Sequence, residues 1–439
     1  MNKLKKSLKL YNKSKKYVAA PSTFSKGFDQ FAYGITPFAL KKGKGAFVWD
    51  VDNNKYIDTI MSLGAIILGH SNSQFNNHII RQLGNATTLS LTSDLEIELS
   101  ELISKNVPCA EMVRYGKNGN DATTVAVRLA RHVTKKNHIL FCGYHGWQDW
   151  YISKTSMNGG IPDEISKYSH RFNYNDIQSL ENLLKKFQNQ VACIILEPVS
   201  KSKPICNTLC KYCKKKCKGF LKQVRELADR YNTILIFDEV VTGFRSSVGG
   251  YQKICKVTPD LACFSKAISN GLPLAVLAGK KKIMKYSDEI FYSLTFGGET
   301  LSIAAALFTI KFLKKHGVCE KIDENGKYLI NEIKNIISDI NFEHIVDIQG
   351  FPYKNFFIFN DDESYKAEII RTFFIQELAK NNILSAGYHI LSFAHNKTVL
   401  DSLLKIYKKN LKSLKLNINN KKLLDKIKIP NPKLSARNI

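Results

Sequence analysis

The sequence predicts an α/β protein, with a mostly parallel sheet flanked by helices in a large domain and a smaller α+β domain after it. The chain has 439 residues, which is too long for one ordinary hydrophobic core. Its hydrophobic fraction of 44% is typical of a folded globular protein. From about residue 75, short apolar runs alternate with amphipathic helical patterns, which indicates βαβ units and a parallel sheet.

The N-terminal part predicts a hairpin. The sequence GAFVWDVDNNKYID contains two short strand patterns around Asp52, Asn53 and Asn54, which are residues that favour turns. The βαβ pattern follows it. We expect strands at 138–144, 191–198 and 232–240, and helices at 121–133 and 218–231.

The C-terminal third predicts a long amphipathic helix at 301–317 and then alternating strands and helices. The end of the chain is polar and interrupted by proline, as in an extended tail. We therefore expect four regions: an N-terminal segment with the hairpin at 1–74, a large domain at 75–305 with a cysteine-rich insertion at 203–218, a small domain at 306–415 and a polar tail at 416–439.

The formal net charge is +27, but the lysines are spread along the chain and form no basic stripe interleaved with aromatic residues. We therefore expect no nucleic-acid partner, and only an attraction for phosphorylated or carboxylated small substrates. No apolar stretch is long enough to span a membrane, and the basic start lacks the apolar region of a secretory signal. We expect a cytoplasmic protein with no membrane partner.

Two segments resemble the edges of a ligand site. GKNGNDAT at 116–123 is a turn that opens a helix, and free amides at a helix N-terminus bind anions such as phosphate. The alternative is a capped helix start with Asp121 near the cap. Tyr144 and His145 follow a buried strand, where ligands of parallel sheets bind, although aromatic residues there can also be surface packing.

Two further segments carry reactive groups. Asp238 ends an apolar run, and a buried carboxylate there needs a cation or a proton donor. A metal site is an alternative; a nucleotide-triphosphate site is excluded because no GxxxxGK[ST] motif precedes it. Lys266 follows a short apolar strand, a setting that lowers a lysine pKa and makes its amine a nucleophile and base.

Together, these segments resemble class III aminotransferases, the fold-type-I pyridoxal-phosphate (PLP) family that includes glutamate-1-semialdehyde aminomutase. The resemblance covers roughly residues 25–400. It rests on TPFALKKGKGAFVWDVDNNKYID, LGH, NGNDAT, YHG, EP, FDEVVTGFR, FSKAISNGLP and TFGGET in this order along the chain.

The resemblance implies PLP as the cofactor and a role for each matching residue. Lys266 would carry PLP as a Schiff base and serve as general base, and Asp238 would contact the pyridine nitrogen. The remaining contacts implied are Gly119 and Asn120 at the phosphate, Tyr144 and Val240 on opposite faces of the ring, His145 and Glu197 nearby, and Thr295 reaching the phosphate from the neighbouring subunit. A homodimer with shared active sites follows from the last contact.

The chain departs from the family in two places. The usual Ser-Gly-Thr-Glu-Ala turn is Asn-Gly-Asn-Asp-Ala here. After Glu197, four cysteines are spaced by three, two and three residues: Cys206, Cys210, Cys213 and Cys217. Four thiolates in twelve residues suit tetrahedral zinc in a structural site, and a metal-free, redox-active loop or an iron–sulfur cluster are the alternatives.

The function expected is transfer of an amino group from an amino-acid donor to a small keto or aldehyde acceptor, phosphorylated or sugar-derived as in surface-polysaccharide biosynthesis. The first alternative is an aminomutase, which keeps the amine within one molecule. A binding protein on an inactive enzyme scaffold is the second alternative, and the presence of both Lys266 and Asp238 argues against it.

Overall fold

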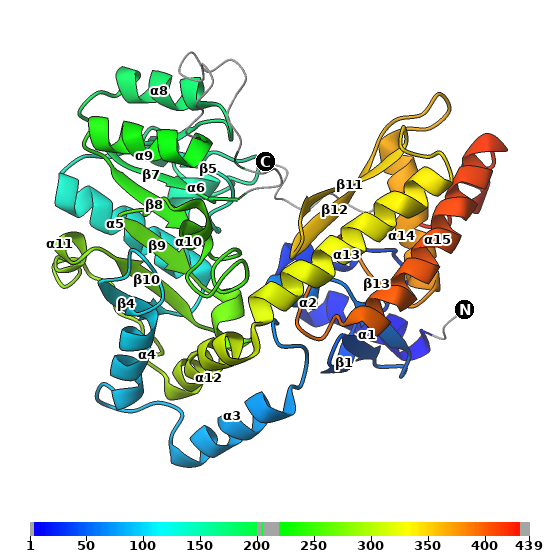
Figure 1. Cartoon of the computed structure of the whole chain (residues 1–439), viewed down its shortest axis with the longest axis horizontal. Coiled ribbons are helices and arrows are strands. Elements are labelled where there is room, and N and C mark those ends of the chain that lie inside the picture. The colour runs from blue at the N-terminus through cyan, green and yellow to red at the C-terminus, as the bar shows by residue number, and fades with distance from the viewer. Residues whose placement is uncertain (1–3, 200–203, 205–218, 431–439) are drawn as a thin grey trace. The chain divides into compact units, whose positions relative to one another are not determined.

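The computed structural model describes residues 4–199, 204 and 219–430. The chain forms two compact units, one made of residues 1–73 with 320–439 and the other of residues 74–319 (Figure 1). The two ends of the chain therefore contribute to the same unit. Among the described helices, none is long and apolar enough to cross a membrane.

The second unit contains a seven-stranded sheet in the order β4-β10-β9-β8-β7-β5-β6. Its strands are β4 Met112–Gly116, β5 His138–Cys142, β6 Ser169–Arg171, β7 Val191–Leu196, β8 Ile234–Asp238, β9 Leu261–Phe264 and β10 Ala275–Gly279. The five strands from β6 to β9 are parallel, and β10 is antiparallel to both β9 and β4. Since β10 reverses the direction between them, β4 runs the same way as β9, and all strands except β10 end at one edge.

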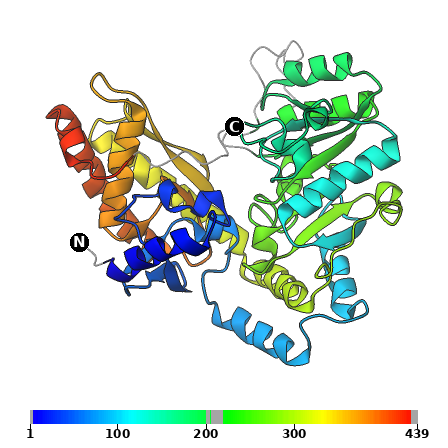
Figure 2. The same cartoon turned by 180° about the vertical axis from the view of Figure 1, so that it is seen from behind.

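Helices flank this sheet, so the predicted α/β class is confirmed. They are α3 Ser73–Asn85, α4 Asp94–Ser104, α5 Gly119–Thr134, α6 Asp149–Ile152, α7 Asp163–Ser166, α8 Ile177–Lys186, α9 Phe220–Arg230, α10 Tyr251–Cys255, α11 Lys281–Met284, α12 Thr300–His316 and the short 3₁₀ turn η3 Lys266–Ser269. Seen from behind in Figure 2, α5 (cyan) lies along one face of the sheet. Helices α8 and α9 lie together, and α9 contacts β8.

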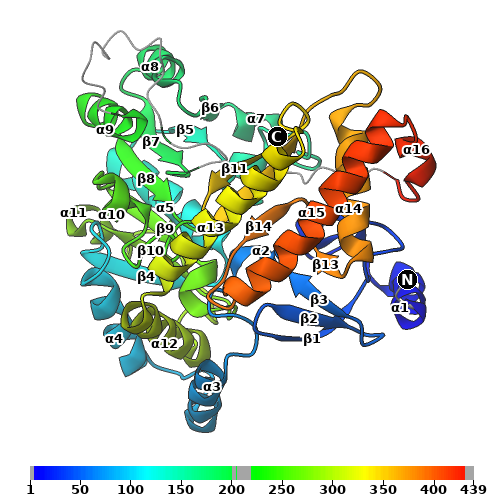
Figure 3. The ribbon, with the colours of Figure 1, turned by 45° about the vertical axis from the view of Figure 1, so that its right-hand side comes forward.

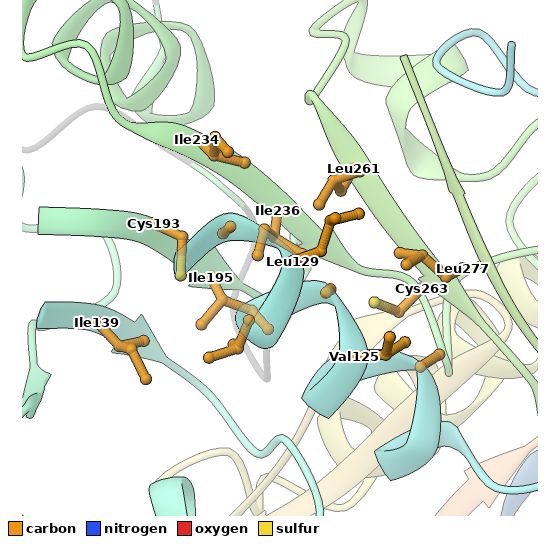
Figure 4. Close-up of a cluster of buried hydrophobic side chains, with 14 of the residues drawn as sticks. Val125, Leu129, Ile139, Cys193, Ile195, Ile234, Ile236, Leu261, Cys263 and Leu277 are labelled. Carbon is orange, nitrogen blue, oxygen red and sulfur yellow. The ribbon is translucent and has the colours of Figure 1, made fainter. Parts of the chain in front are cut away.

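The core of the second unit lies between α5 and the sheet. Val125 and Leu129 of α5 are 2% and 0% exposed and belong to one apolar cluster with Ile236 of β8 and Cys263 of β9 (Figure 4). Burying a side chain of this kind contributes about 1.5–3 kcal/mol. Because side chains alternate along a strand, Asp238 points to the same face as Ile236, the face that carries α5.

The first unit has two small sheets. The strands β1 Leu40–Lys44, β2 Phe47–Asp50 and β3 Lys55–Asp58 form one sheet with β13 Ile383–Leu384, and β11 Val346–Phe351, β12 Lys354–Phe359 and β14 Tyr388–Ile390 form the other. Its helical segments are α1 Lys5–Tyr17, η1 Phe24–Lys26, η2 Phe28–Gln30, α2 Met61–Gly64, α13 Val318–Asp339, α14 Ala367–Lys380, α15 Lys397–Asn419 and α16 Leu423–Lys426. Helices α14 and α15 pack side by side (Figure 3). The ring centroids of Phe374 and Tyr407, one from each helix, lie 4.7 and 5.3 Å from that of Phe357 in β12.

The N-terminal hairpin has the turn expected from its sequence, since β2 and β3 pair antiparallel and Asn53 has a φ of 68°. Helix α1 was not expected. Its first turn is held by Asp52, whose carboxylate oxygens accept the amides of Lys6 and Ser7 at 2.9 Å each. A cap that lies 45 residues away is not visible in local sequence, which explains why the helix was missed.

Candidate active site

The carboxyl ends of neighbouring parallel strands bring the candidate residues together. In sheet order, β4, β9, β8, β7 and β5 all end at the same edge. The residues at or just after these ends are Gly119 and Asn120 after β4, Lys266 after β9, Asp238 and Val240 at β8, Glu197 after β7, and Tyr144 and His145 after β5. This edge is where open α/β sheets bind their ligands.

Asp238 and His145 form a buried pair at this edge. The Asp238 side chain is 5% exposed and its Oδ2 lies 2.8 Å from His145 Nδ1, while its Oδ1 accepts the amide of Val240 at 3.1 Å. Thr123 of α5 donates its hydroxyl to the backbone carbonyl of His145 at 2.9 Å. Helix α5 thereby fixes the histidine, and the histidine fixes the carboxylate.

Both ring nitrogens of His145 have a partner. Nε2 lies 3.2 Å from the carbonyl oxygen of Cys142, which can only accept a hydrogen bond, and Nδ1 lies 2.8 Å from Asp238 Oδ2. These two contacts fix the orientation of the imidazole ring beside the Asp238 carboxylate.

Lys266 lies directly after β9 in an apolar setting. Residues 261–264 of β9 are fully buried, and Lys266 itself is half-buried. Its φ is 52°, in the left-handed region that costs a non-glycine residue of order 1–3 kcal/mol. Ser265 supports this bend by donating its hydroxyl to the carbonyl of Leu274 in the next turn, at 2.7 Å.

The turn that opens α5 has close backbone contacts. The carboxylate of Asp121 accepts the amides of Lys117 and Asn118 at 3.0 and 2.7 Å and thus holds the turn. A Cβ on Gly119 would lie 2.8 Å from both methyl carbons of Val240, so the helix start packs directly against the residue after β8. Asn118 and Asp121 also form a capping box, so the alternative of a capped helix start is observed, and the amide of Asp121 donates to the carbonyl of Asn118 at 2.9 Å. The earlier first-turn amides, of Gly119 and Asn120, have no acceptor within the helix and can face an anion.

The segment after β5 is tied both to this turn and to β7. Gly146 has a φ of 111°, and a Cβ there would lie 2.4 Å from the Cβ of Asn120. The amide of Tyr144 donates to Glu197 Oε2 at 3.1 Å. The Tyr144 ring packs edge-on against Tyr151 at 5.7 Å, so Glu197 positions an aromatic residue at the edge of the site.

Thr295 stands apart from these residues. It is exposed, on the loop that leads to α12. That loop is anchored at its end, because Glu299 caps α12 and its Oε1 accepts a hydrogen bond from Lys117 Nζ at 2.8 Å in a half-buried ion pair. A single chain thus brings the other predicted cofactor contacts to one edge and leaves Thr295 on an exposed loop.

One buried acid at this edge was missed. Glu239 follows Asp238, is fully buried, and accepts four hydrogen bonds. Burial raises the pKa of its carboxyl group above the ordinary value, against the opposing effect of the donors. Strand alternation could have revealed it, since two consecutive acids in extended backbone point to opposite sides.

No metal site is present in the described part of the chain, where no group of three or more His, Cys, Asp or Glu could hold an ion. The four cysteines for which zinc was predicted, Cys206, Cys210, Cys213 and Cys217, lie outside the described residues. The zinc hypothesis therefore stays a prediction.

Comparisons with known proteins bear on the family to which the chain belongs. A model of the aminotransferase class-III family matches residues 30–412. The 3-aminobutyryl-CoA aminotransferase of Cloacimonas acidaminovorans (strain Evry) is 34% identical over 88% of this chain and 91% of its own length. The glutamate-1-semialdehyde 2,1-aminomutase of Wigglesworthia glossinidia brevipalpis is 36% identical over 73% of this chain and 76% of its own.

Two solved structures share the fold at 21% identity. One is an omega-transaminase from Sphaerobacter thermophilus, with a TM-score of 0.82 over 93% of this chain and 98% of that chain. The other is the FumI protein of Sphingopyxis sp. MTA144 in its PLP internal aldimine form, with a TM-score of 0.84 over 98% of this chain and 99% of that chain. The match to the family model and the identity to these relatives show that the chain belongs to the class III aminotransferase family.

Proposed function

We propose that the protein is a PLP-dependent enzyme that moves an amino group from an amino-acid donor to a small keto or aldehyde acceptor. The observation that carries this proposal is the convergence of a buried carboxylate, Asp238, and a half-buried lysine, Lys266, at the ends of neighbouring strands. A lysine and an acid placed in this way suit PLP, which needs an amine for attachment and an anion at its ring nitrogen.

The residues at this edge suit PLP in their chemistry and charge. The start of α5 offers amides for a phosphate, and Gly119 leaves no room for a side chain between this turn and Val240. Val240 and Tyr144 provide apolar and aromatic surface for a flat ring, since both pack partly buried against the main core. Asp238 provides the negative charge, and Lys266 the amine.

When bound, PLP supplies an electron sink for the carbon atom that loses a proton. Asp238 would face the ring nitrogen, and the contact with His145 Nδ1 at 2.8 Å would hold the Asp238 carboxylate in place. Lys266 would provide the amine to which the cofactor attaches. Its Nζ, when free, would serve as the general base that takes a proton from the donor carbon.

The covalent attachment can be tested by reduction with borohydride. Protein incubated with one equivalent of PLP is reduced and digested, and the labelled peptide is identified by mass spectrometry. We expect the label on Lys266. Lys256→Ala is a matched control because Lys256 is exposed and has nearly the same backbone, with a φ of 54°, so both alanine variants carry similar strain. A label on another lysine, or one that survives in Lys266→Ala, would refute the assignment.

An aminomutase is the second candidate, because relatives such as the Wigglesworthia protein carry that name at 36% identity. The two activities differ in their products. A transferase releases a keto compound from a free donor such as glutamate, whereas a mutase releases none. A screen of amines that bleach the visible absorbance of the cofactor, followed by keto-acid analysis, separates them. Use of a sugar-derived or phosphorylated acceptor stays a prediction that the same screen tests.

We further propose that two copies form a dimer with shared active sites. Two adjacent loops expose large apolar side chains: Leu91 is 86% exposed, and Phe291 and Phe296 are 85% and 60% exposed. The loops are joined at Thr300, whose amide donates to the carbonyl of Thr87 at 2.9 Å. Large apolar side chains that gather on adjacent loops are a feature of interaction surfaces. Sedimentation of the wild type and of Leu91→Asp tests this: a monomeric wild type would contradict it.

A further inference from the structure

The carboxylate of Glu239 is fully buried and entirely used for hydrogen bonding. Oε2 accepts the hydroxyl of Thr242 at 2.7 Å and the amide of Tyr251 at 2.6 Å. Oε1 accepts the backbone amide and the side-chain amide of Gln252 at 3.2 Å each. One carboxylate therefore joins the turn after β8 to the first turn of α10.

The hydrogen-bond network of Glu239 continues through Gln252, and the backbone at Gly250 packs against the Glu239 carboxylate. The side-chain oxygen of Gln252 accepts the amide of Cys109 at 3.0 Å, so the network reaches the segment before β4. Gly250 approaches so closely that a Cβ there would lie 2.5 Å from Glu239 Oε1, and its φ is 77°. This contact excludes other residues at position 250 and keeps the end of the loop against the acid.

The backbone of Glu239 is fixed as firmly as its side chain. Its amide donates to the carbonyl of Cys263 in β9 at 2.9 Å, and its carbonyl accepts the amide of Gly243 at 2.8 Å. The residue before it is Asp238 and the residue after it is Val240, whose amide donates to Asp238 Oδ1. The carboxylate on one side of the sheet thus holds the turn whose other side carries the two predicted cofactor contacts.

We propose that Glu239 is a positioning residue for the cofactor: its four hydrogen bonds hold the turn 239–242 so that Asp238 and Val240 keep their places at the edge of the sheet. This inference rests on the proposed function, because the ligand it serves is PLP. Glu239 would not touch PLP. It acts through the turn, so its loss should affect cofactor binding and turnover more than donor binding.

Glu239→Gln is the informative variant. Glutamine has the same shape, but its amide nitrogen would face N–H donors and leave buried groups without acceptors. The matched control is Asp260→Asn. Asp260 is also a buried acid next to β8 and β9, but at their opposite ends, where its Oδ2 accepts from Arg225 Nη1 at 2.7 Å and from the amide of Leu235 at 2.9 Å. Both substitutions remove hydrogen bonds of a buried carboxylate, but only Glu239 lies at the edge of the sheet that carries the proposed site.

The measurements are urea unfolding of each protein without cofactor, the PLP dissociation constant by fluorescence titration, and kcat and KM for an amino donor. We expect both variants to be less stable than wild type but folded at low temperature. Glu239→Gln should bind PLP about tenfold to about a hundredfold more weakly and have a lower kcat with an unchanged KM for the donor. Asp260→Asn should keep the wild-type PLP affinity and the wild-type kcat.

Three results would overturn the inference. The first is Glu239→Gln binding PLP like wild type, and the second is Asp260→Asn losing affinity to the same extent, which would mean a general effect of stability. The third is a wild-type protein that binds no PLP, which alone would also overturn the proposed function. Titration of the wild type therefore separates the two failures.

Discussion

Replacing Gly119 by alanine tests the contact between α5 and the end of β8. The added Cβ would lie 2.8 Å from both methyl carbons of Val240. Carbon atoms pack without repulsion at about 3.5–4.0 Å, so one of the two residues must move by roughly 1 Å. Overpacking of this kind costs about 1–3 kcal/mol. Alanine in a helix gains about 0.5–1 kcal/mol over glycine, which leaves a net loss of about 1 kcal/mol.

A double-mutant cycle with Val240→Ala isolates the contact. Removing the methyl groups makes room for the new Cβ, so the two substitutions together should destabilise less than the sum of their separate effects. We expect a coupling of about 1–2 kcal/mol between them, measured by urea unfolding of the cofactor-free protein. The affinity for PLP provides a second readout, since Gly119→Ala shifts the helix start expected to hold the phosphate.

Additivity of the two substitutions within about 0.5 kcal/mol would refute the contact, because independent sites behave in this way. Gly84→Ala is a suitable control for the effect of alanine in a helix. Gly84 lies in α3, and a Cβ there would meet no heavy atom within 4 Å. It should be neutral or slightly stabilising, with unchanged PLP affinity.

Two further substitutions test other parts of the structure. Burial, with a smaller effect of His395, lowers the pKa of the His389 imidazole to about 3 from 6.5, so the folded state resists a proton that the unfolded state binds. The contribution of His389 to stability should therefore fall as the pH decreases below 6.5, by about 2–3 kcal/mol at pH 4.5. His389→Gln should accordingly show a shallower pH dependence of the free energy of unfolding in urea between pH 7 and 4.5, and an unchanged dependence would contradict this. Gly146→Ala would place a Cβ 2.4 Å from that of Asn120 on a residue with a φ of 111°. We therefore expect the free energy of unfolding to fall by about 2 kcal/mol or more and PLP to bind more weakly. Wild-type stability and wild-type PLP affinity in this variant would contradict the reasoning.

Much of the second unit could be predicted because its signals are local. Apolar runs such as ILIF before Asp238 and LACF before Lys266 are buried on both faces, as strands of a parallel sheet are, and each ends at a polar residue. The position of a reactive residue directly after such a run places it at the ligand-binding edge without knowledge of the strand order. The candidate residues on β8 and β9 followed from this rule.

The features that escaped prediction depend on pairings distant in sequence. The first unit joins both chain ends through β13, which pairs parallel with β3 although more than 300 residues separate them, so no local pattern shows the unit. The three consecutive residues Met61, Ser62 and Leu63 have positive φ values of 47°, 52° and 58°. None of them is glycine, so their sequence gives no sign of a left-handed turn. The carboxylate of Asp58 holds the turn by accepting the amides of Ile60 and Met61 at 2.8 and 3.0 Å.

The pair Asp238-Glu239 shows how one sequence feature can hold two roles that the sequence does not separate. Asp238 is the last residue of β8 and Glu239 follows it, and from the sequence either acid could have been the partner of a cofactor. Alternation places Asp238 on the α5 face, where His145 meets it, and Glu239 on the other side, where four donors from the Thr242 turn and α10 use all of its carboxylate. The donors around the two acids therefore differ: Glu239 accepts four hydrogen bonds, whereas Asp238 has one contact to each carboxylate oxygen. This difference is the reason for proposing Asp238 as the residue that binds PLP and Glu239 as the residue that positions it.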